Sequence, residues 1–384
     1  MRDLAAPAVS RTVFTSEWVG TARRDTTAFL ALTIFLVLVG LLMVYSASSF
    51  MAQNRGLPDH FFLQRQAERA MVGLVAMYVC ARIDYRRWAH VAWPLVALAA
   101  FALLLVIAPG TEAIAPVRNN ARRWLDLGIT VQPSEMAKLA AVIWTATLAA
   151  KKGDRIRSLR WGMAPFAVVL GSLMFLILIE PDLSGAAVLG LVTALTLFAA
   201  GARIGHFILV GLLAVPILWD QIMEVSYRLS RVLSFLGTQP DPEGVGYQLQ
   251  QSLIAIGSGG PWGVGFGQSV QKFHFLPEPH NDFIFAIVGE EWGFVGAATL
   301  ILSLALLGHF GMRIARRAPD RFGFLLGVGL TLLFVITGGM HLAVTMGVIP
   351  TAGVTLPFLS YGGSNLVISC VAAGILLNIG SWRA

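Results

Sequence analysis

The chain has 384 residues, of which 56% are hydrophobic and only 13% charged, and its mean hydropathy is +0.72. Soluble domains carry about a quarter charged residues, so this composition excludes a soluble enzyme. The net charge of +7 does not indicate nucleic-acid binding, because the basic residues stand in short clusters between apolar runs, as membrane orientation requires. Cys80 and Cys370 lie within apolar runs, and we interpret both as small buried side chains rather than disulfide or metal ligands.

The apolar runs predict an all-α integral membrane protein of about ten transmembrane helices, because about 20 apolar residues cross a bilayer. The predicted helices are 28–46, 67–82, 89–108, 134–150, 163–180, 184–201, 203–220, 283–311, 322–346 and 360–380. The first run is long for a signal peptide and further spans follow, so we interpret it as a retained signal anchor. Residues 1–27 are then a cytoplasmic N-terminal tail, and residues 28–384 a single membrane domain.

Lysine and arginine counts predict the orientation of these helices. With the N-terminus inside, about 18 basic residues fall on the cytoplasmic side and about 10 outside, the bias that the positive-inside rule describes. Both termini are then cytoplasmic, and the long connections 109–133 and 221–282 lie outside. The second of these is a large extracytoplasmic loop between the seventh and eighth helices. Arg122 and Arg123 oppose the bias, either as ordinary loop charges near headgroups or because they have another role.

Two polar clusters fall at predicted outer helix ends. Glu135 and Lys138 are three residues apart at the start of a helix, so they share a face and can pair. The pair is either a local salt bridge or a substrate contact. The turn 180–182, Glu-Pro-Asp, is either polar because it faces water or points its carboxylates into an outer cavity.

A third cluster places Glu278, His280 and Asp282 within five residues, just before a long apolar run. Asp282 can cap that helix, because a carboxylate is favoured at a helix N-terminus. It can also act as a general base, since burial raises a carboxylate pKa toward the useful range. The glycine-rich series 257–267 matches no phosphate-binding fingerprint, and we interpret it as a re-entrant segment lining a cavity.

The fourth cluster, 350–365, enters the last helix with hydroxyls, prolines and glycines. It is either a helix entry built from Pro and Gly or an anion or headgroup contact at a helix N-terminus. No metalloprotease, nucleophile-elbow, Walker or CxxC motif occurs in the sequence. From the residues alone, the chain is either an enzyme acting on a lipid-linked substrate or a transporter.

Seven short motifs, in order along the chain, resemble those of the SEDS family, the shape, elongation, division and sporulation proteins. They are Val44–Ser48, Ala121–Trp124, Gln132–Glu135, Glu180–Asp182, Gly246–Gln248, Phe275–Ala286 and Ser360–Gly363. The chain looks more like the division branch, FtsW, than the elongation branch, RodA, because of the runs 227–231, 289–291 and 353–357. Two residues depart from the pattern: Asn281 replaces the usual Thr, and Asn120 the usual Gly, which leaves the shape of the loop 109–133 open.

The resemblance implies a ten-helix peptidoglycan glycosyltransferase of the bacterial inner membrane, active at the division septum. Its substrate would be lipid II, the undecaprenyl-pyrophosphate-linked disaccharide-pentapeptide, and its product a glycan strand. Expected partners are a class B penicillin-binding protein, a transpeptidase, and other divisome membrane proteins. The alternatives are a lipid II flippase, a scaffold that only recruits its partner, or an elongation-type polymerase.

The resemblance also implies roles for residues of this chain. Asp282 would be the catalytic base, and Arg122, Arg123 and Lys138 would bind the lipid-linked pyrophosphate, with Glu135 orienting Lys138. Gln248, His280 and Ser360 lie in the shared motifs and are expected to contact substrate. No sequence feature fixes a metal ion, although a divalent cation, Mg or Mn, could share the task of binding pyrophosphate.

Overall fold

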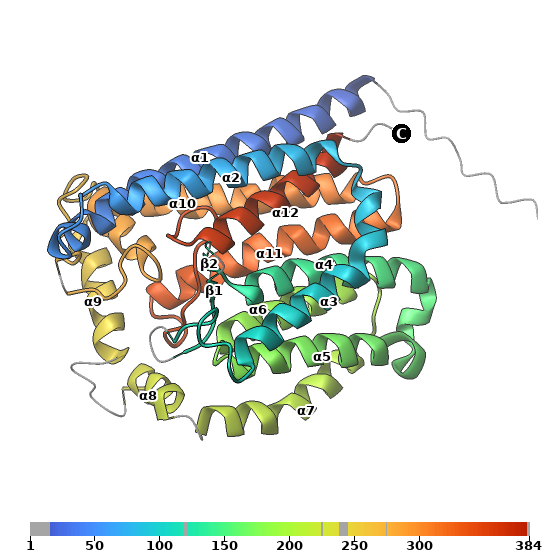
Figure 1. Cartoon of the computed structure of the whole chain (residues 1–384). Helices are drawn as coiled ribbons and strands as arrows, with labels where there is room; N and C mark the ends of the chain where they lie inside the picture. The colour runs from blue at the N-terminus through green and yellow to red at the C-terminus, as the bar shows by residue number, and fades with distance from the viewer. Residues whose placement is uncertain are drawn as a thin grey trace, which may run out of the picture.

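The computed structural model describes residues 16–117, 121–126, 128, 130–223, 226–237, 245–273 and 275–381. It is a bundle in which most helices run roughly parallel to one long direction, with α9 lying across it and loops gathered at the two ends (Figure 1). The helices are α1 Ser16–Asn54, α2 Phe61–Arg82, α3 Trp88–Ile107, α4 Pro133–Lys152, α5 Ala164–Ile179, α6 Leu183–Ala199, α7 Ile204–Met223, α8 Ser226–Phe235, α9 Val245–Ser258, α10 Ile284–Arg316, α11 Arg321–Thr345 and α12 Gly363–Ser381. A two-stranded antiparallel hairpin, β1 Leu125–Asp126 and β2 Thr130–Val131, precedes α4.

Each of the ten predicted runs coincides with a helix, namely α1 to α7 and α10 to α12, while α8 and α9 form within the predicted loop 221–282. Six helical segments in the described part of the chain are long and apolar enough to cross a membrane. They are Arg23–Asn54, Tyr85–Ile107, Leu159–Ile179, Ile284–Arg316, Arg321–Thr345 and Gly363–Ser381. The chain is therefore a multi-pass membrane protein, in which α2 and α4 carry charged residues that lower their hydropathy.

The first helix is longer at both ends than predicted, because its polar residues find partners inside the protein. It begins at Ser16, within the predicted tail 1–27. Near that end Asp25 is buried and pairs with Arg313 (3.0 Å), in the last turn of α10, and with Arg317 (2.5 Å), just after that helix. Near the other end Ser46 donates to Glu291 of α10 at 2.5 Å, and the helix continues past the predicted stop at residue 46 to Asn54.

The core lies around α4 and α11, whose side chains are buried on nearly every face. Helix α4 packs against α3, α6 and α11, and α12 packs against α2. In contrast, α7 exposes much of its apolar surface and lies with α8 at the margin of the bundle (Figure 1). Because lipid is as apolar as these side chains, the exposed surface is compatible with a bilayer.

The loop between α11 and α12 lies close against α1. A Cβ atom at Gly40 would lie 2.5 Å from the carbonyl oxygen of Phe358, so only glycine permits this approach. The loop is thereby held inside the bundle rather than over its surface. It lies at the end of the bundle away from the C-terminus, on the left in Figure 1, together with the β hairpin and the loop 259–283.

Candidate active site

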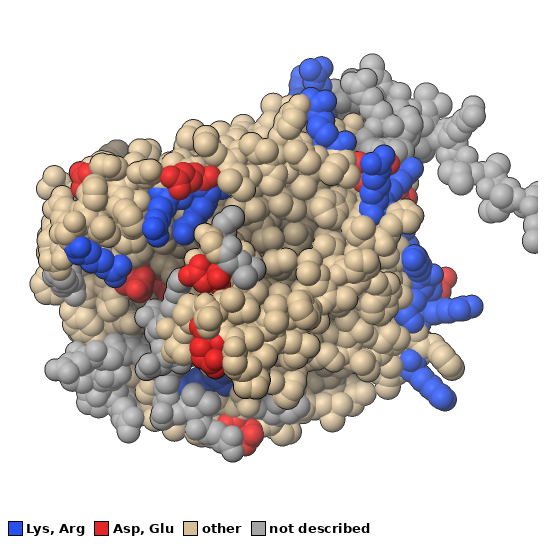
Figure 2. Space-filling view, in the orientation of Figure 1, with Lys and Arg blue, Asp and Glu red and all other residues tan. Residues whose placement is uncertain are grey.

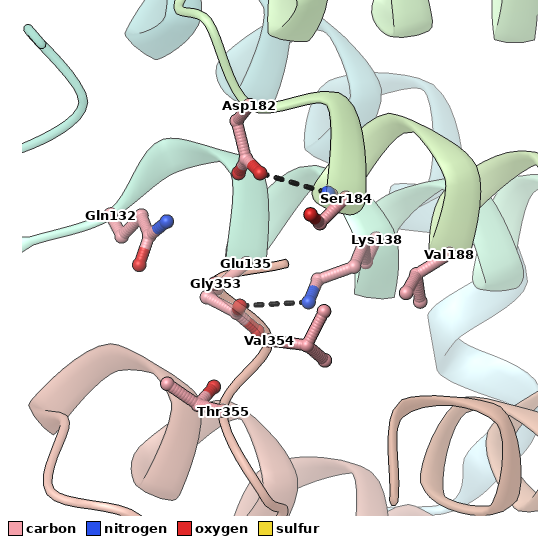
Figure 3. Close-up of a pocket in the computed structure, with 10 residues that line it drawn as sticks. Gln132, Glu135, Lys138, Asp182, Ser184, Val188, Gly353, Val354 and Thr355 are labelled. Carbon is pink, nitrogen blue, oxygen red and sulfur yellow. Dashed lines mark hydrogen bonds and ion pairs between the residues drawn. The ribbon is translucent and has the colours of Figure 1, made fainter. Parts of the chain in front are cut away.

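A small pocket opens where the first turns of α4 and α6 meet the loop between α11 and α12 (Figure 3). Its volume is about 30 Å³. The residues that line it are Gln132, Glu135, Lys138, Asp182, Ser184, Gly185, Val188, Gly353, Val354 and Thr355. The pocket is too small for a sugar, so a carbohydrate substrate requires the surrounding segments to move apart.

The Glu135–Lys138 pair lies in this pocket. Lys138 Nζ is 2.7 Å from Glu135 Oε1, and both residues are buried. The pair forms on one face of α4 because the residues are three apart. A buried charge costs several kcal/mol unless it is paired, so each of these side chains supports the other inside an apolar helix.

Asp182 closes the pocket on the α6 side. Its carboxylate accepts a hydrogen bond from the Gly185 amide at 2.8 Å, which caps α6, and another from Ser134 Oγ at 3.1 Å. Figure 3 shows its side chain directed toward the start of α6. Asp182 therefore joins the beginnings of α4 and α6 and fixes one wall of the pocket.

Arg123 stabilises the turn that precedes α6. Its guanidinium donates to the carbonyl oxygens of Glu180 (3.1 Å) and Pro181 (2.6 Å). Burial and the nearby Asp182 charge raise the pKa of Glu180 to about 9, against the opposing effect of Arg123. Among the residues that the structure describes, neither carboxylate oxygen of Glu180 has a hydrogen-bond partner. Glu180 is therefore a buried, protonated acid at neutral pH.

Asp282 lies in the loop before α10, with its carboxylate against Gly353. A Cβ atom at residue 353 would lie 3.4 Å from Asp282 Oδ2. Burial, then the Glu278 charge, raises the pKa of Asp282 to about 6, while Arg231 and Arg123 act to lower it. The carboxylate is therefore a stronger base than an ordinary aspartate and is ionised at neutral pH.

The backbone before Asp282 is tied to the loop before α12. Ser360 Oγ donates to the Asn281 carbonyl oxygen at 2.7 Å and accepts from the Leu356 amide at 2.8 Å. The Tyr361 amide donates to the His280 carbonyl oxygen at 2.9 Å. In this structure Ser360, predicted to contact substrate, is buried and holds the segment that carries Asp282.

His280 is also buried, and its ring packs against Phe62 and Tyr361. Burial, with the charge of Arg55, lowers the pKa of His280 to about 4, so the ring is neutral at physiological pH. Its Nε2 atom is 3.8 Å from Glu278. In this structure the contacts of His280 are therefore those of a packing residue in the loop before α10.

Arg122 and Gln248 lie outside the pocket lining. The Arg122 guanidinium donates to the Ala108 and Ala115 carbonyl oxygens and to Thr111 Oγ1, at 3.3, 3.1 and 2.7 Å. It thereby closes the loop before β1. Gln248 is half-buried on α9. Asn120 lies outside the described residues.

Sequence reasoning missed Arg231 as a site residue. It lies on the short helix α8, three residues after Arg228, and its charge lowers the pKa of Asp282. Burial, partly offset by Asp282, lowers the pKa of Arg231 to about 10. The neighbouring Arg228 is buried and donates to the Gln221 carbonyl oxygen at 3.0 Å. The arginines of the run 227–231 could have been noted in the sequence as candidate site residues. That Arg231 acts on Asp282 depends on the tertiary fold, which the sequence pattern does not give.

Sequence reasoning also missed a buried polar cluster that anchors the loop 259–283 to α10. Lys272 Nζ lies 3.2 Å from Glu291 Oε1 and donates to the Gly267 carbonyl oxygen at 2.6 Å. Glu290 accepts from Ser269 Oγ at 2.5 Å and from the Val270 amide at 2.8 Å. The glycine series follows α9 and packs directly on this part of α10, and its re-entrant path stays a prediction.

The described residues contain no group of three or more His, Cys, Asp or Glu side chains arranged to hold a metal ion. Carboxylates near the pocket are instead engaged by the protein itself: Glu135 by Lys138, and Asp182 by Ser134 and the Gly185 amide. The site therefore presents cationic side chains and the ionised Asp282 carboxylate as its candidate reactive groups.

Comparison with known proteins agrees with this architecture. The model of the FtsW/RodA/SpoVE cell cycle protein family matches residues 26–383. The chain is 43% identical over 351 residues to a probable peptidoglycan glycosyltransferase FtsW of Trichlorobacter lovleyi, covering 91% of each protein. It is 40% identical to stage V sporulation protein E of Bacillus subtilis, over 91% of this chain and 94% of that protein.

Two solved structures share the fold. A chain from a structure described as "Structural coordination of polymerization and crosslinking by a peptidoglycan synthase complex" has a TM-score of 0.74 and 30% identity, over 92% of this chain and 96% of that one. The rod shape determining protein RodA of Thermus thermophilus has a TM-score of 0.67 and 26% identity, over 92% and 95%. The match to the family model over nearly the whole chain shows that this protein belongs to the FtsW/RodA/SpoVE family of SEDS proteins.

Proposed function

We propose that this protein is a peptidoglycan glycosyltransferase that polymerises lipid II into glycan strands. One observation carries the proposal: the ionised Asp282 carboxylate, with its raised pKa, lies beside a pocket that contains Lys138 and within the electrostatic reach of Arg123 and Arg231. A base next to several cations is the combination that glycosyl transfer from a pyrophosphate requires. The names of the FtsW relatives support the same activity.

Asp282 acts as the general base in this mechanism. It takes the proton of the acceptor sugar 4-hydroxyl as that oxygen forms a bond to the anomeric carbon of the growing strand. The bond from this carbon to the pyrophosphate oxygen breaks, and undecaprenyl pyrophosphate leaves with the electron pair. Direct displacement inverts the anomeric centre. A pKa of about 6 suits the step, because the carboxylate is free to accept a proton at neutral pH.

The cations stabilise the charge that develops on the leaving pyrophosphate. Lys138 supplies a point charge within the pocket, and guanidinium groups match phosphate oxygens in pairs. Arg123 already donates to two backbone carbonyls in the turn before α6. It therefore stabilises the pyrophosphate mainly through the electrostatic effect of its charge, unless that turn opens. Arg122 is engaged in its own loop and stays a weaker candidate. A divalent cation, Mg or Mn, is not assigned a step, since no described ligand set fits one.

We propose the ten-helix topology with both termini cytoplasmic, because of how Lys and Arg are distributed between the two ends of the bundle. Figure 2 shows Lys and Arg gathered at the end of the bundle near the C-terminus, with few acidic side chains among them. At the opposite end basic and acidic side chains are mixed. The positive-inside rule therefore favours the pocket end as the extracytoplasmic face of the bacterial inner membrane.

The division branch, a septal location and a class B penicillin-binding protein partner belong to the same proposal. The FtsW names of the relatives favour division over elongation. The structural neighbour from a peptidoglycan synthase complex supports a transpeptidase partner. Because we assign the chain to the division branch, we also propose other divisome membrane proteins as its partners.

The position of the charged groups favours a transferase over a lipid II flippase. Glu135 begins α4, Asp182 caps α6, and Asp282 precedes α10, so all three lie at one end of the bundle. A transporter typically binds its substrate near the middle of the membrane. The groups described here instead suit a substrate that is already on the outer surface.

Polymerisation of purified lipid II tests the proposal. The full-length protein, with and without a class B penicillin-binding protein, is incubated with lipid II in the presence of moenomycin, and products are resolved by gel. Wild type should form polymer, and Asp282→Ala should form none while inserting and folding normally. Asp154→Ala is the matched control, because Asp154 is exposed at the opposite end of the bundle. An active, folded Asp282→Ala variant contradicts the base assignment.

Failure of the wild type to form polymer, even in a verified complex with its partner, would contradict the transferase function itself. Transport of fluorescent lipid II across liposomes containing the protein would then test the flippase alternative.

A further inference from the structure

His341 is a buried histidine that the mechanism above does not use. It lies on α11, one turn before the end of the helix at Thr345, and its side chain has no exposed surface. Its Nδ1 atom lies 2.6 Å from the Val354 carbonyl oxygen. A carbonyl oxygen only accepts hydrogen bonds, so Nδ1 carries the proton and donates. The Nε2 atom is buried and has no partner in the described structure.

The bonded carbonyl belongs to an irregular segment, 350–359, that connects α11 to α12. No helix or strand fixes this backbone, so side-chain contacts determine its path. The Leu356 amide donates to Ser360 Oγ at 2.8 Å, and Asn365 Nδ2 donates to the Leu356 carbonyl oxygen at 3.5 Å. His341 supplies the corresponding contact at Val354, on the side of the segment nearer to α11.

This segment forms the wall between the pocket and Asp282. Gly353, Val354 and Thr355 line the pocket opposite Glu135 and Lys138 (Figure 3). Gly353 also faces the Asp282 carboxylate, because a Cβ atom at this position would lie 3.4 Å from Asp282 Oδ2. A shift of the Val354 carbonyl therefore moves both the pocket wall and the backbone that faces the half-buried Asp282 carboxylate.

We propose that His341 is a positioning residue, which acts through its Nδ1–H bond to the Val354 carbonyl to hold Gly353 against the Asp282 carboxylate. It does not touch the reacting atoms. The proposal rests on the proposed function, because Asp282 has a basic role only in that reaction. It assigns a purpose to a buried polar residue that a helix interior would otherwise disfavour.

The bond sets the basicity of Asp282 through solvent exposure. Glu278 and Asp182 raise the pKa of that carboxylate, and Arg231 and Arg123 lower it, but burial is the largest cause of the rise. If the segment moves away, water reaches the carboxylate and the contribution of burial falls. The pKa of Asp282 then drops from about 6 toward its ordinary value, and the acid limb of the pH–rate profile moves to lower pH.

Three substitutions test this proposal in the full-length protein. His341→Asn keeps a donor near the place of Nδ1, whereas His341→Gln moves the donor toward the place of Nε2. His341→Leu keeps a similar bulk and removes the donor. Leu and Gln should lower polymerisation at neutral pH by about 10-fold, the lower end of the effect seen when a group that orients a metal ligand is lost. Asn should stay close to wild type.

The pH dependence separates positioning from a general loss of stability. The acid limb should move to lower pH in His341→Leu and His341→Gln but not in His341→Asn. Loss of activity with an unchanged acid limb, or equal damage in Asn and Leu, would overturn the proposal. If His341→Leu does not fold, the acid limbs of His341→Asn and His341→Gln are compared, and this comparison alone decides the proposal.

A direct titration keeps this test independent of catalysis. The infrared band of the protonated Asp282 carboxyl is assigned by its absence in Asp282→Asn and is followed with pH in each variant. A lower midpoint in His341→Gln than in wild type supports the proposal, and an unchanged midpoint overturns it. Wild type that makes no polymer but shows the expected midpoints would refute the transferase function and leave the positioning of Asp282 by His341 established.

Discussion

Gly353 faces the Asp282 carboxylate although the two residues are 71 positions apart: a Cβ atom on Gly353 would be 3.4 Å from Asp282 Oδ2. That distance is ordinary van der Waals contact, and the backbone at Gly353 has no positive φ, so alanine fits there. A branched side chain would extend into the carboxylate. The size of residue 353 therefore limits what can approach Asp282 from the pocket.

The effect of a substitution at Gly353 on polymerisation should depend on the size of the new side chain. Gly353→Ala should keep polymerisation within about threefold of wild type, whereas Gly353→Val should lose more than about tenfold, because overpacking at a filled site costs about 1–3 kcal/mol. Initial rates on lipid II at pH 7.5 measure the difference, and gel filtration checks folding. Equal activity of the Ala and Val variants would show that residue 353 does not bound the reacting space.

Asp282→Asn should make the protein inactive but more stable at pH 7.5. The folded-state pKa of Asp282 is raised to about 6 from 3.8, so between these values the native protein holds a proton that the unfolded chain has lost. The contribution of Asp282 to stability therefore falls as pH rises through this window. The variant should unfold a few degrees above wild type at pH 7.5, with the difference shrinking at pH 5. Thermal unfolding in detergent measures it, and a constant difference would contradict the raised pKa.

Glu180→Gln should leave the polymerisation activity nearly unchanged. The pKa of Glu180 is raised from 4.5 to about 9, so the native acid is protonated across the neutral range and glutamine resembles it in shape and charge. Between those pKa values the wild type loses stability as pH rises, because only its native state holds the proton. Glutamine removes this dependence, so the variant should gain stability relative to wild type between pH 5 and 8. Glu180→Lys, which places a charge in the same buried site, should not fold.

The Lys272–Glu291 pair should show strong coupling between its two members. Lys272→Met leaves the Glu291 carboxylate buried without its cation, which typically costs about 3–5 kcal/mol. The double variant, Lys272→Met with Glu291→Gln, removes both charges and should recover much of that stability. Thermal unfolding of the four proteins in the cycle measures the coupling. Additive losses would indicate that the two side chains act separately.

The sequence alone predicted the helices well, because the signal for a membrane helix is local. An unbroken apolar run has to satisfy its backbone within itself, so the ten runs became helices wherever they lay in the chain. The motif positions of Glu135, Lys138 and Asp282 were likewise visible, since charges beside apolar runs are rare. The i, i+3 spacing of Glu135 and Lys138 predicted their contact, and the structure confirms it at 2.7 Å.

Only the tertiary structure decided which polar residues meet. Arg122 and Arg123 are neighbours in sequence, yet one closes the loop before β1 and the other stabilises the turn before α6. Ser46 and Glu291 bond across 245 positions, a distance at which no periodicity carries information. The end of α1 and the surroundings of Asp282 therefore could not be predicted, because burial and pairing depend on which helices pack together, and hydropathy determines only that each segment is a helix.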